Sequence, residues 1–320
     1  MSEAYFTEGS LLMTAKNSEY TSSLESLEAA MREGVILEGI ATRCNGVHKL
    51  TVELGEFTGT IEKDEVQLTC GEPIKDIAVI TRVGKPVCFK VVSVERKRMG
   101  EPVITLSRRL AQLDCAVNYL SHLTPGDIIP AKVTHLEKFG AFVDVGCGIV
   151  SLLSIDCMSV SRISHPGDRL SVGCELSVAV RGIQRNELHI PTRIFVSRRE
   201  LLGTWEENAA LFSTGQTVTG IVRSVESYGV FVELTPNLAG LAEYRDDVTV
   251  GQSVAVYIKN IIPERMKIKL VIIDSARSMS PNRSCAPVIH SDASHIDRWR
   301  YSPACCEKLI ETVFDGEIYC

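Results

Sequence analysis

Three stretches of this chain repeat one another at intervals of about 90 residues, and this repetition limits the fold more than any other feature. Each repeat holds a short run of valine, an acidic residue and an aliphatic residue: VELG from Val52, VDVG from Val143 and VEL from Val232. Each repeat also opens with a similar run: EGIA from Glu38, PAKV from Pro130 and TGIV from Thr219. We therefore expect one small domain to be used three times.

The second repeat is the best guide to the architecture of this domain. Ile128 to Leu136, Phe139 to Val145 and Ile149 to Leu153 alternate apolar with polar residues, as short strands do, and Gly146 and Gly148 mark a turn. Two more strand patterns follow in every repeat, the first of them directly after a Val-Gly pair. Five strands with glycine at the corners predict a mainly β fold of three consecutive five-stranded barrels of the OB type.

The segments around the repeats predict short helices. Ser22 to Arg32 has a capping start and apolar residues at helical spacing, whereas the residues before Thr21 are expected to be disordered. Leu110 to Leu123 and Arg199 to Phe212 predict helical linkers. The predicted organisation is an arm and helix at 1–33, a first repeat at 34–109, a linker at 110–124, a second repeat at 125–199, a linker at 200–213, a third repeat at 214–274 and a tail at 275–320.

The C-terminal residues differ in composition from the repeats. Residues 275–295 are rich in Ser, Pro and Asn and predict a loop or disordered run. The apolar residues that follow predict a helical patch: Trp299, Tyr301, Leu309, Ile310, Val313 and Phe314. The sequence leaves open whether this patch docks on a barrel or on a partner.

Composition excludes several classes of protein. No run approaches the roughly 18 apolar residues of a membrane helix, and the N-terminus lacks a secretory pattern, so we expect a cytoplasmic protein without membrane partners. A net charge of −6 argues against a dedicated duplex-DNA binder, which is usually basic. Eleven dispersed cysteines without a CxxC pair predict reduced, buried thiols.

Two aromatic residues of the second repeat are the first candidates for function. Phe139 and Phe142 lie three apart, and a bulge or bend at Gly140 would bring both rings to one side of the barrel. With Lys132 and Lys138 nearby, they would form a stacking surface with a cationic margin, which suits single-stranded nucleic acid. The alternative is that both rings belong to the barrel core.

The same residues carry a family resemblance. The run aromatic-Gly-x-Phe-Val occurs at Phe139 and at Tyr228, and the linker contains LGTWE from Leu202 before a new strand begins. The order of these motifs resembles the RNA-binding repeat of bacterial ribosomal protein S-one, in its short three-repeat form. The resemblance covers about residues 30 to 273. It is strong in the second and third repeats, whereas the first is degenerate.

The resemblance implies a binding surface in each repeat. In the second repeat it falls on Phe139, Phe142, Ser154, Gln184 and Arg193, where Ser154 and Gln184 stand in place of the family's usual His and Asp. In the third repeat it falls on Tyr228, Phe231, Glu243 and Lys267, and the acidic Glu243 would repel phosphate. In the first repeat His48 and Thr51 replace both aromatics, which suggests protein docking instead.

Taken together, the sequence predicts a single-stranded RNA-binding protein of translation that holds mRNA near the small ribosomal subunit, attached there through the first repeat. No catalytic motif is present, so we expect no enzyme activity and no cofactor. The spacing of Cys285, His290, His295, Cys305 and Cys306 matches no usual zinc pattern, so no metal is expected. The alternatives are a protein-interaction adaptor and an RNA-binding regulatory factor in transcription or RNA decay.

Overall fold

The computed structural model describes residues 5–69, 72–96, 101–187, 189–274, 289 and 293–315. These residues form two compact units. The first unit comprises residues 1–123 with the segments 144–150 and 185–193, and the second comprises residues 124–143, 151–184 and 194–320.

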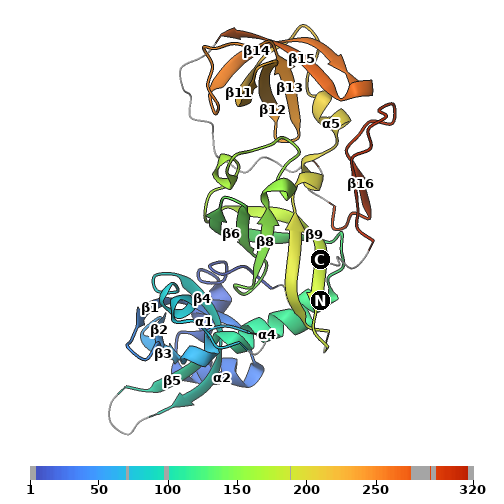
Figure 1. Ribbon diagram of the computed structural model, residues 1–320. Helices are drawn as coiled ribbons and strands as arrows, with labels where there is room; N and C mark the ends of the chain where they lie inside the picture. The colour runs from blue at the N-terminus through green and yellow to red at the C-terminus, as the bar shows by residue number, and fades with distance from the viewer. Residues whose placement is uncertain are drawn as a thin grey trace. The chain divides into compact units, whose positions relative to one another are not determined.

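The strands close into three five-stranded barrels, as the repeats predict (Figure 1). The first barrel contains β1 (Leu37–Cys44), β2 (Leu50–Leu54), β3 (Phe57–Ile61), β4 (Pro86–Glu95) and β5 (Val103–Ser107). The second contains β6 (Ile128–Glu137), β7 (Gly140–Asp144), β8 (Val150–Ser154), β9 (Glu175–Arg185) and β10 (Pro191–Ser197). The third contains β11 (Thr217–Glu226), β12 (Gly229–Thr235), β13 (Leu238–Ala242), β14 (Ser253–Ile262) and β15 (Lys267–Asp274).

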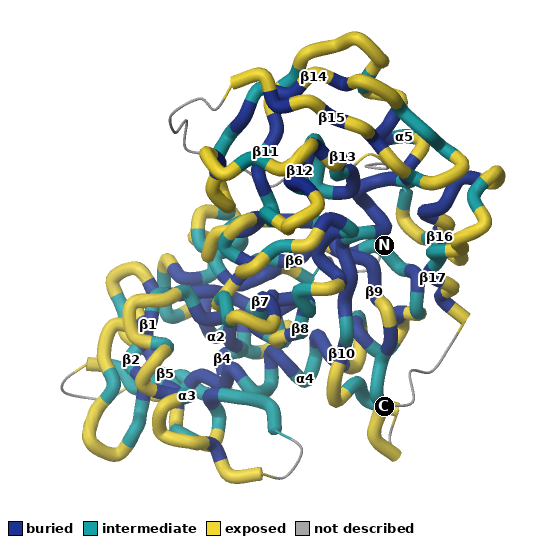
Figure 2. The backbone as a smooth tube through the Cα atoms, turned by 45° about the horizontal axis from the view of Figure 1, so that its top comes forward, coloured by how far each residue is buried: buried dark blue, intermediate teal, exposed yellow. Residues whose placement is uncertain are grey.

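The three barrels share one pattern of strand pairing. In each, the third strand pairs in parallel with the fifth, as β3 does with β5, β8 with β10 and β13 with β15. The other strand pairs of the first and third barrels are antiparallel, which is the pattern of a closed Greek-key barrel. The strands of the barrels carry many of the buried residues, which are dark blue in Figure 2. The predicted mainly β fold of OB-like barrels is confirmed.

The helices cap and connect the barrels. The α-helices are α1 (Ala15–Tyr20), α2 (Leu24–Glu33), α3 (Asp76–Ile80), α4 (Arg108–Asn118) and α5 (Trp205–Ala209). Short 3-10 turns are η1 (Lys63–Glu65), η2 (Leu120–His122), η3 (Ile155–Cys157), η4 (Pro166–Asp168), η5 (Arg199–Leu202) and η6 (Pro263–Arg265). Ser23 caps α2 through its side chain and Gly34 ends the helix at a φ of 67°, so the predicted N-terminal helix is confirmed.

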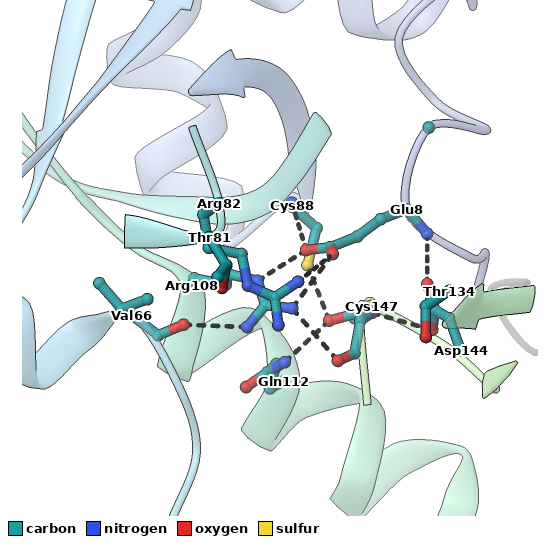
Figure 3. Close-up of polar contacts among 12 residues, drawn as sticks. Glu8, Val66, Thr81, Arg82, Cys88, Arg108, Gln112, Thr134, Asp144 and Cys147 are labelled. Atoms are coloured by element: carbon teal, nitrogen blue, oxygen red, sulfur yellow. Dashed lines mark hydrogen bonds and ion pairs between the residues drawn. The ribbon is translucent and has the colours of Figure 1, made fainter. Parts of the chain in front are cut away.

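Residues 5–20 of the N-terminal arm are ordered, so the prediction of disorder before Thr21 is wrong there; residues 1–4 lie outside the described residues. The carboxylate of Glu8 is buried and accepts hydrogen bonds from Arg108 Nε at 2.6 Å and Nη2 at 3.1 Å (Figure 3). The backbone N–H of Glu8 donates to Asp144 Oδ2 at 2.7 Å. The Glu38 carboxylate accepts three more hydrogen bonds from the arm, donated by the backbone N–H groups of residues 9, 11 and 12. These contacts hold the arm inside the first unit.

The described part of the tail is a β-hairpin and not a helical patch. β16 (Arg298–Arg300) pairs antiparallel with β17 (Glu311–Val313). Trp299 and Tyr301 are buried against the third barrel and its linker, where Tyr301 Oη donates to the carbonyl of Asn237 at 2.5 Å. The tail therefore docks on a barrel of its own chain. The predicted loop at 275–295 lies largely outside the described residues.

The cysteines follow the sequence prediction at most described positions. Seven are free thiols: Cys44, Cys88, Cys115, Cys147, Cys157, Cys305 and Cys306. Four of these seven are buried. Cys174 is disulfide-bonded, so the prediction of reduced thiols is wrong at that position.

Candidate nucleic-acid interface

The aromatic pair of the second barrel, Phe139 and Phe142, lies on the outer surface. Phe139 is 54% exposed and Phe142 is half-buried, whereas Ala141 and Val143 between and beyond them point into the core. The two rings meet edge to face, with centroids 6.0 Å apart and planes at 89°. This excludes the alternative in which both rings are packed inside the barrel.

Gly140 permits this arrangement because the strands approach closely there. A Cβ atom at Gly140 would lie 2.5 Å from the carbonyl oxygen of Leu153 and 3.0 Å from Cα of Ser154. Any side chain would therefore push β7 away from the end of β8. The same close approach places Ser154 beside the aromatic pair, where the resemblance predicts a polar group.

The aromatic pair of the third barrel, Tyr228 and Phe231, repeats the geometry. Tyr228 is 68% exposed and Phe231 is half-buried, with centroids 6.1 Å apart and planes at 88°. Gly229 has a φ of 155°, and a Cβ there would lie 2.5 Å from the carbonyl oxygen of Ala242. Two barrels thus present the same pair of rings by the same backbone device.

The predicted basic residues differ in their placement. Lys138 is exposed and directly precedes Phe139, while Arg193 is exposed on β10. Lys132 is half-buried on β6, with Glu175 as its partner across the strand pair. Lys267 is exposed at the start of β15. Lys138 is thus adjacent to an aromatic pair in the sequence, whereas Lys132 already has an acidic neighbour.

Strand register identifies two candidate residues that the sequence reasoning missed. Phe231 pairs with Leu241 and Leu241 pairs with Lys269, so Lys269, exposed two residues after Lys267, lies in the same row as the ring. In the second barrel Leu152 pairs with Phe195, a half-buried ring two residues after Arg193. The alternation of β10 and β15 puts both residues on the outer face.

The positions at which this chain departs from the family pattern lie on or beside the barrel strands. Glu243 is exposed just after β13, and Gln184 is half-buried on β9. In the first barrel His48 lies in the β1–β2 turn, with Nδ1 at 3.5 Å from Asp76 Oδ1. Thr51 is half-buried on β2. The first barrel therefore lacks the ring pair at these two positions.

Other kinds of site find no support in the described ranges. Within residues 5–69, 72–96, 101–187, 189–274, 289 and 293–315, no group of three or more His, Cys, Asp or Glu could hold a metal ion. Cys285 and His290 of the tail set lie outside these ranges. Over the same part of the chain, no helix is both long enough and apolar enough to span a bilayer.

Outward ring pairs on small five-stranded barrels are typical of proteins that bind single-stranded nucleic acid. Comparison with known proteins points to the same class. Residues 122–195, the second barrel, match the family model of the S1 RNA binding domain. The chain therefore holds three barrels, of which the second matches the S1 RNA binding domain, the family that the resemblance names.

Most of the chain is similar to small ribosomal subunit protein bS1. It is 25% identical to that of Rhizobium meliloti over 280 residues, which is 82% of this chain and 47% of that protein. It is 29% identical to that of Neisseria meningitidis over 265 residues, which is 77% of this chain and 44% of that protein. The chain thus spans about half the length of the curated relatives it matches.

A solved structure from Streptococcus pneumoniae, a multidomain protein with nucleic acid binding domains, is also similar. The match covers 76% of this chain and 75% of that one, at 16% identity and a TM-score of 0.23.

Proposed function

We propose that this protein binds single-stranded RNA, and mRNA in particular, in the cytoplasm, and that it acts in translation by holding the message near the small ribosomal subunit. The observation that carries the proposal is the repeated outward pair of rings, Phe139 with Phe142 and Tyr228 with Phe231. The S1 RNA binding domain at residues 122–195 and the similarity to bS1 support it. A catalytic role forms no part of this proposal.

Both rings and charges contribute to such binding. A base that stacks on an aromatic side chain contributes roughly 1–3 kcal/mol, and it does so for any base because every base has a π face. Lys138, Lys132 and Arg193 in the second barrel and Lys267 in the third would contact phosphates without reading sequence. Ser154 would supply a hydroxyl beside the rings. The result is an affinity that depends on salt and only weakly on sequence.

A fluorescence-anisotropy titration with a labelled uridine-rich RNA tests the proposal. The double substitution Phe139→Ala with Phe142→Ala should weaken binding at least about five-fold, since it removes two stacking surfaces. Val172→Ala is the matched control, because Val172 is an exposed apolar residue of the second barrel outside the aromatic pair. Equal affinity of the double variant and the control would reject stacking by the second barrel.

The first barrel is proposed to attach the protein to the ribosome. Its α3 presents two exposed isoleucines, Ile77 and Ile80, and Val47 and Val83 are also exposed in this barrel. Exposed apolar residues of this kind suit a protein surface better than a phosphate backbone. With Ile77→Asp and Ile80→Asp together, ribosome co-sedimentation should fall while RNA anisotropy stays unchanged. Undiminished co-sedimentation would reject this docking surface.

A protein-interaction adaptor is the second candidate function. It is favoured by Glu243, an exposed carboxylate at the end of β13 in the third barrel that would repel phosphate. The same anisotropy titration separates the two functions, because an adaptor would bind no RNA at any salt concentration.

A further inference from the structure

A bulge in the first strand of the barrel decides which residue faces the second ring position. In the third barrel Val222 pairs with Val232, but the next pair is Ser224 with Phe231, so the register skips one residue of β11. In the first barrel Ala41 pairs with Val52, and Arg43 then pairs with Thr51. In both barrels the bulge turns the residue that follows it toward the ring position.

The corresponding residue of the second barrel is His135. It precedes Phe142 by seven residues, as Ser224 precedes Phe231. The skipped position is Thr134, whose Oγ1 donates to the carbonyl of Phe142 at 3.0 Å. Thr134 and His135 are both exposed, which breaks the in-out alternation of β6 as a bulge does.

The imidazole of His135 joins the aromatic pair. Its centroid lies 6.3 Å from that of Phe142, and the two planes differ by only 20°, so the rings stack with an offset. The side chain is 61% exposed. Its Nε2 lies 2.7 Å from Glu137 Oε1, and since a carboxylate only accepts, the imidazole N–H donates. This bond holds an otherwise mobile exposed ring in one orientation.

We propose that His135 is a third stacking ring of the second barrel, which takes a further base of single-stranded RNA beside those held by Phe139 and Phe142. The proposal rests on the proposed function and extends it to a residue for which neither the sequence reasoning nor the resemblance gave a role. A planar, exposed ring almost parallel to Phe142 offers a base the same kind of surface as the phenylalanines.

The proposal also ranks the barrels. The position that faces the second ring holds Arg43 in the first barrel, His135 in the second and Ser224 in the third. Only the second barrel therefore has three rings at these positions. It should be the strongest RNA-binding module of the chain, and a histidine in place of Ser224 should improve the third barrel.

Anisotropy titrations of the full chain with labelled oligouridine test this. His135→Ala should weaken binding roughly five-fold, which corresponds to about 1 kcal/mol, whereas His135→Phe should bind like the native chain because it keeps the ring. Ser224→His should strengthen binding by a similar factor. His122→Ala, which removes an exposed histidine outside the ring cluster, serves as the control.

The outcomes separate this inference from the proposed function. Unchanged binding by His135→Ala, together with weakened binding by Phe139→Ala with Phe142→Ala, would overturn the role of His135 and leave the proposed function standing. Equal weakening by His135→Ala and His135→Phe would overturn stacking as the contact. Unchanged binding by the double phenylalanine variant would instead reject stacking by the second barrel, on which the proposed function rests. Trp205 and Trp299 are the chain's two tryptophans and both lie in the second unit, so their fluorescence reports that this unit remains folded.

Discussion

Replacing Glu8 by Gln should destabilise the first unit strongly, although Glu8 lies in an arm that the sequence alone presents as polar and disordered. The Arg108 side chain is fully buried, and its guanidinium reaches both carboxylate oxygens of Glu8. Arg82 Nη1 lies 3.4 Å from the same carboxylate. Glu8→Gln would leave the buried guanidinium of Arg108 and the half-buried one of Arg82 without this counter-charge.

The magnitude follows from the burial of the pair. Removing one partner of a buried ion pair costs about 3–5 kcal/mol, because the remaining charge stays out of water. Burial alone would raise the pKa of Glu8, but Arg108 and Arg82 lower it below its ordinary value. The carboxylate therefore stabilises the fold at neutral pH, and this contribution is lost only as the pH falls through the lowered pKa.

Hydrogen exchange read by mass spectrometry is the suitable assay, since both tryptophans lie in the second unit and fluorescence would miss the effect. Amides of α2 and α4 should exchange roughly 10²–10⁴ times faster in Glu8→Gln. Glu25→Gln is the control, because Glu25 pairs with Arg96 at an exposed position. The double variant Glu8→Gln with Arg108→Met should lose less stability than the sum of the losses of the two single variants. Amide exchange rates in Glu8→Gln equal to those of the native chain would refute stabilisation of the first unit by this ion pair.

Three further predictions concern the second unit. Gly140→Ala should lower the free energy of unfolding of the second barrel, measured by urea denaturation, by about 1–3 kcal/mol and should weaken RNA binding, because the new Cβ meets backbone 2.5 Å away. Gly46→Ala is the control and should change neither quantity, because its Cβ meets nothing within 4 Å. Hydrogen bonding to Asp127 raises the pKa of His295, so tail docking should weaken as the pH rises through that raised value. Limited proteolysis of the tail should therefore become faster over this pH range, and His295→Gln should remove the pH dependence. Trp299→Ala should cost about 3–5 kcal/mol and expose the hairpin to protease; a protease-resistant tail would contradict this.

The barrels were predictable because their signals are local and repeated. Alternation places Val143 and Val232 inside, and the same pattern at three positions removes the ambiguity of any single strand. The outward rings were predictable for a related reason. A glycine between Phe139 and Phe142 permits the close strand approach that brings both rings to one side.

The N-terminal arm was not predictable because its partners are distant in sequence. Glu8 is buried by Arg108, 100 residues away, and nothing within the arm announces that pair. The tail differs, because its signal was present and misread. Trp299 and Tyr301 lie two apart, which is strand spacing, whereas Leu309, Ile310 and Val313 suggested a helix. Lys269 and Phe195 were missed because only the parallel register of the closed barrel assigns them to the rows of Leu241 and Leu152.

The third barrel and most of the second lie in one compact unit, and this bears on how weak binding surfaces become useful. Arg169, from the second barrel, is buried against Glu233 of β12, with Nη2 2.6 Å from Oε2, and Arg223 Nε donates to the same carboxylate at 2.7 Å. A buried, shared carboxylate of this kind fixes the two barrels to each other more firmly than a flexible linker would. Under the proposed function, once one ring pair held an RNA strand, the second would meet that strand at high effective concentration. Modest stacking at each barrel would then be sufficient for firm retention of a long message, while short fragments would dissociate.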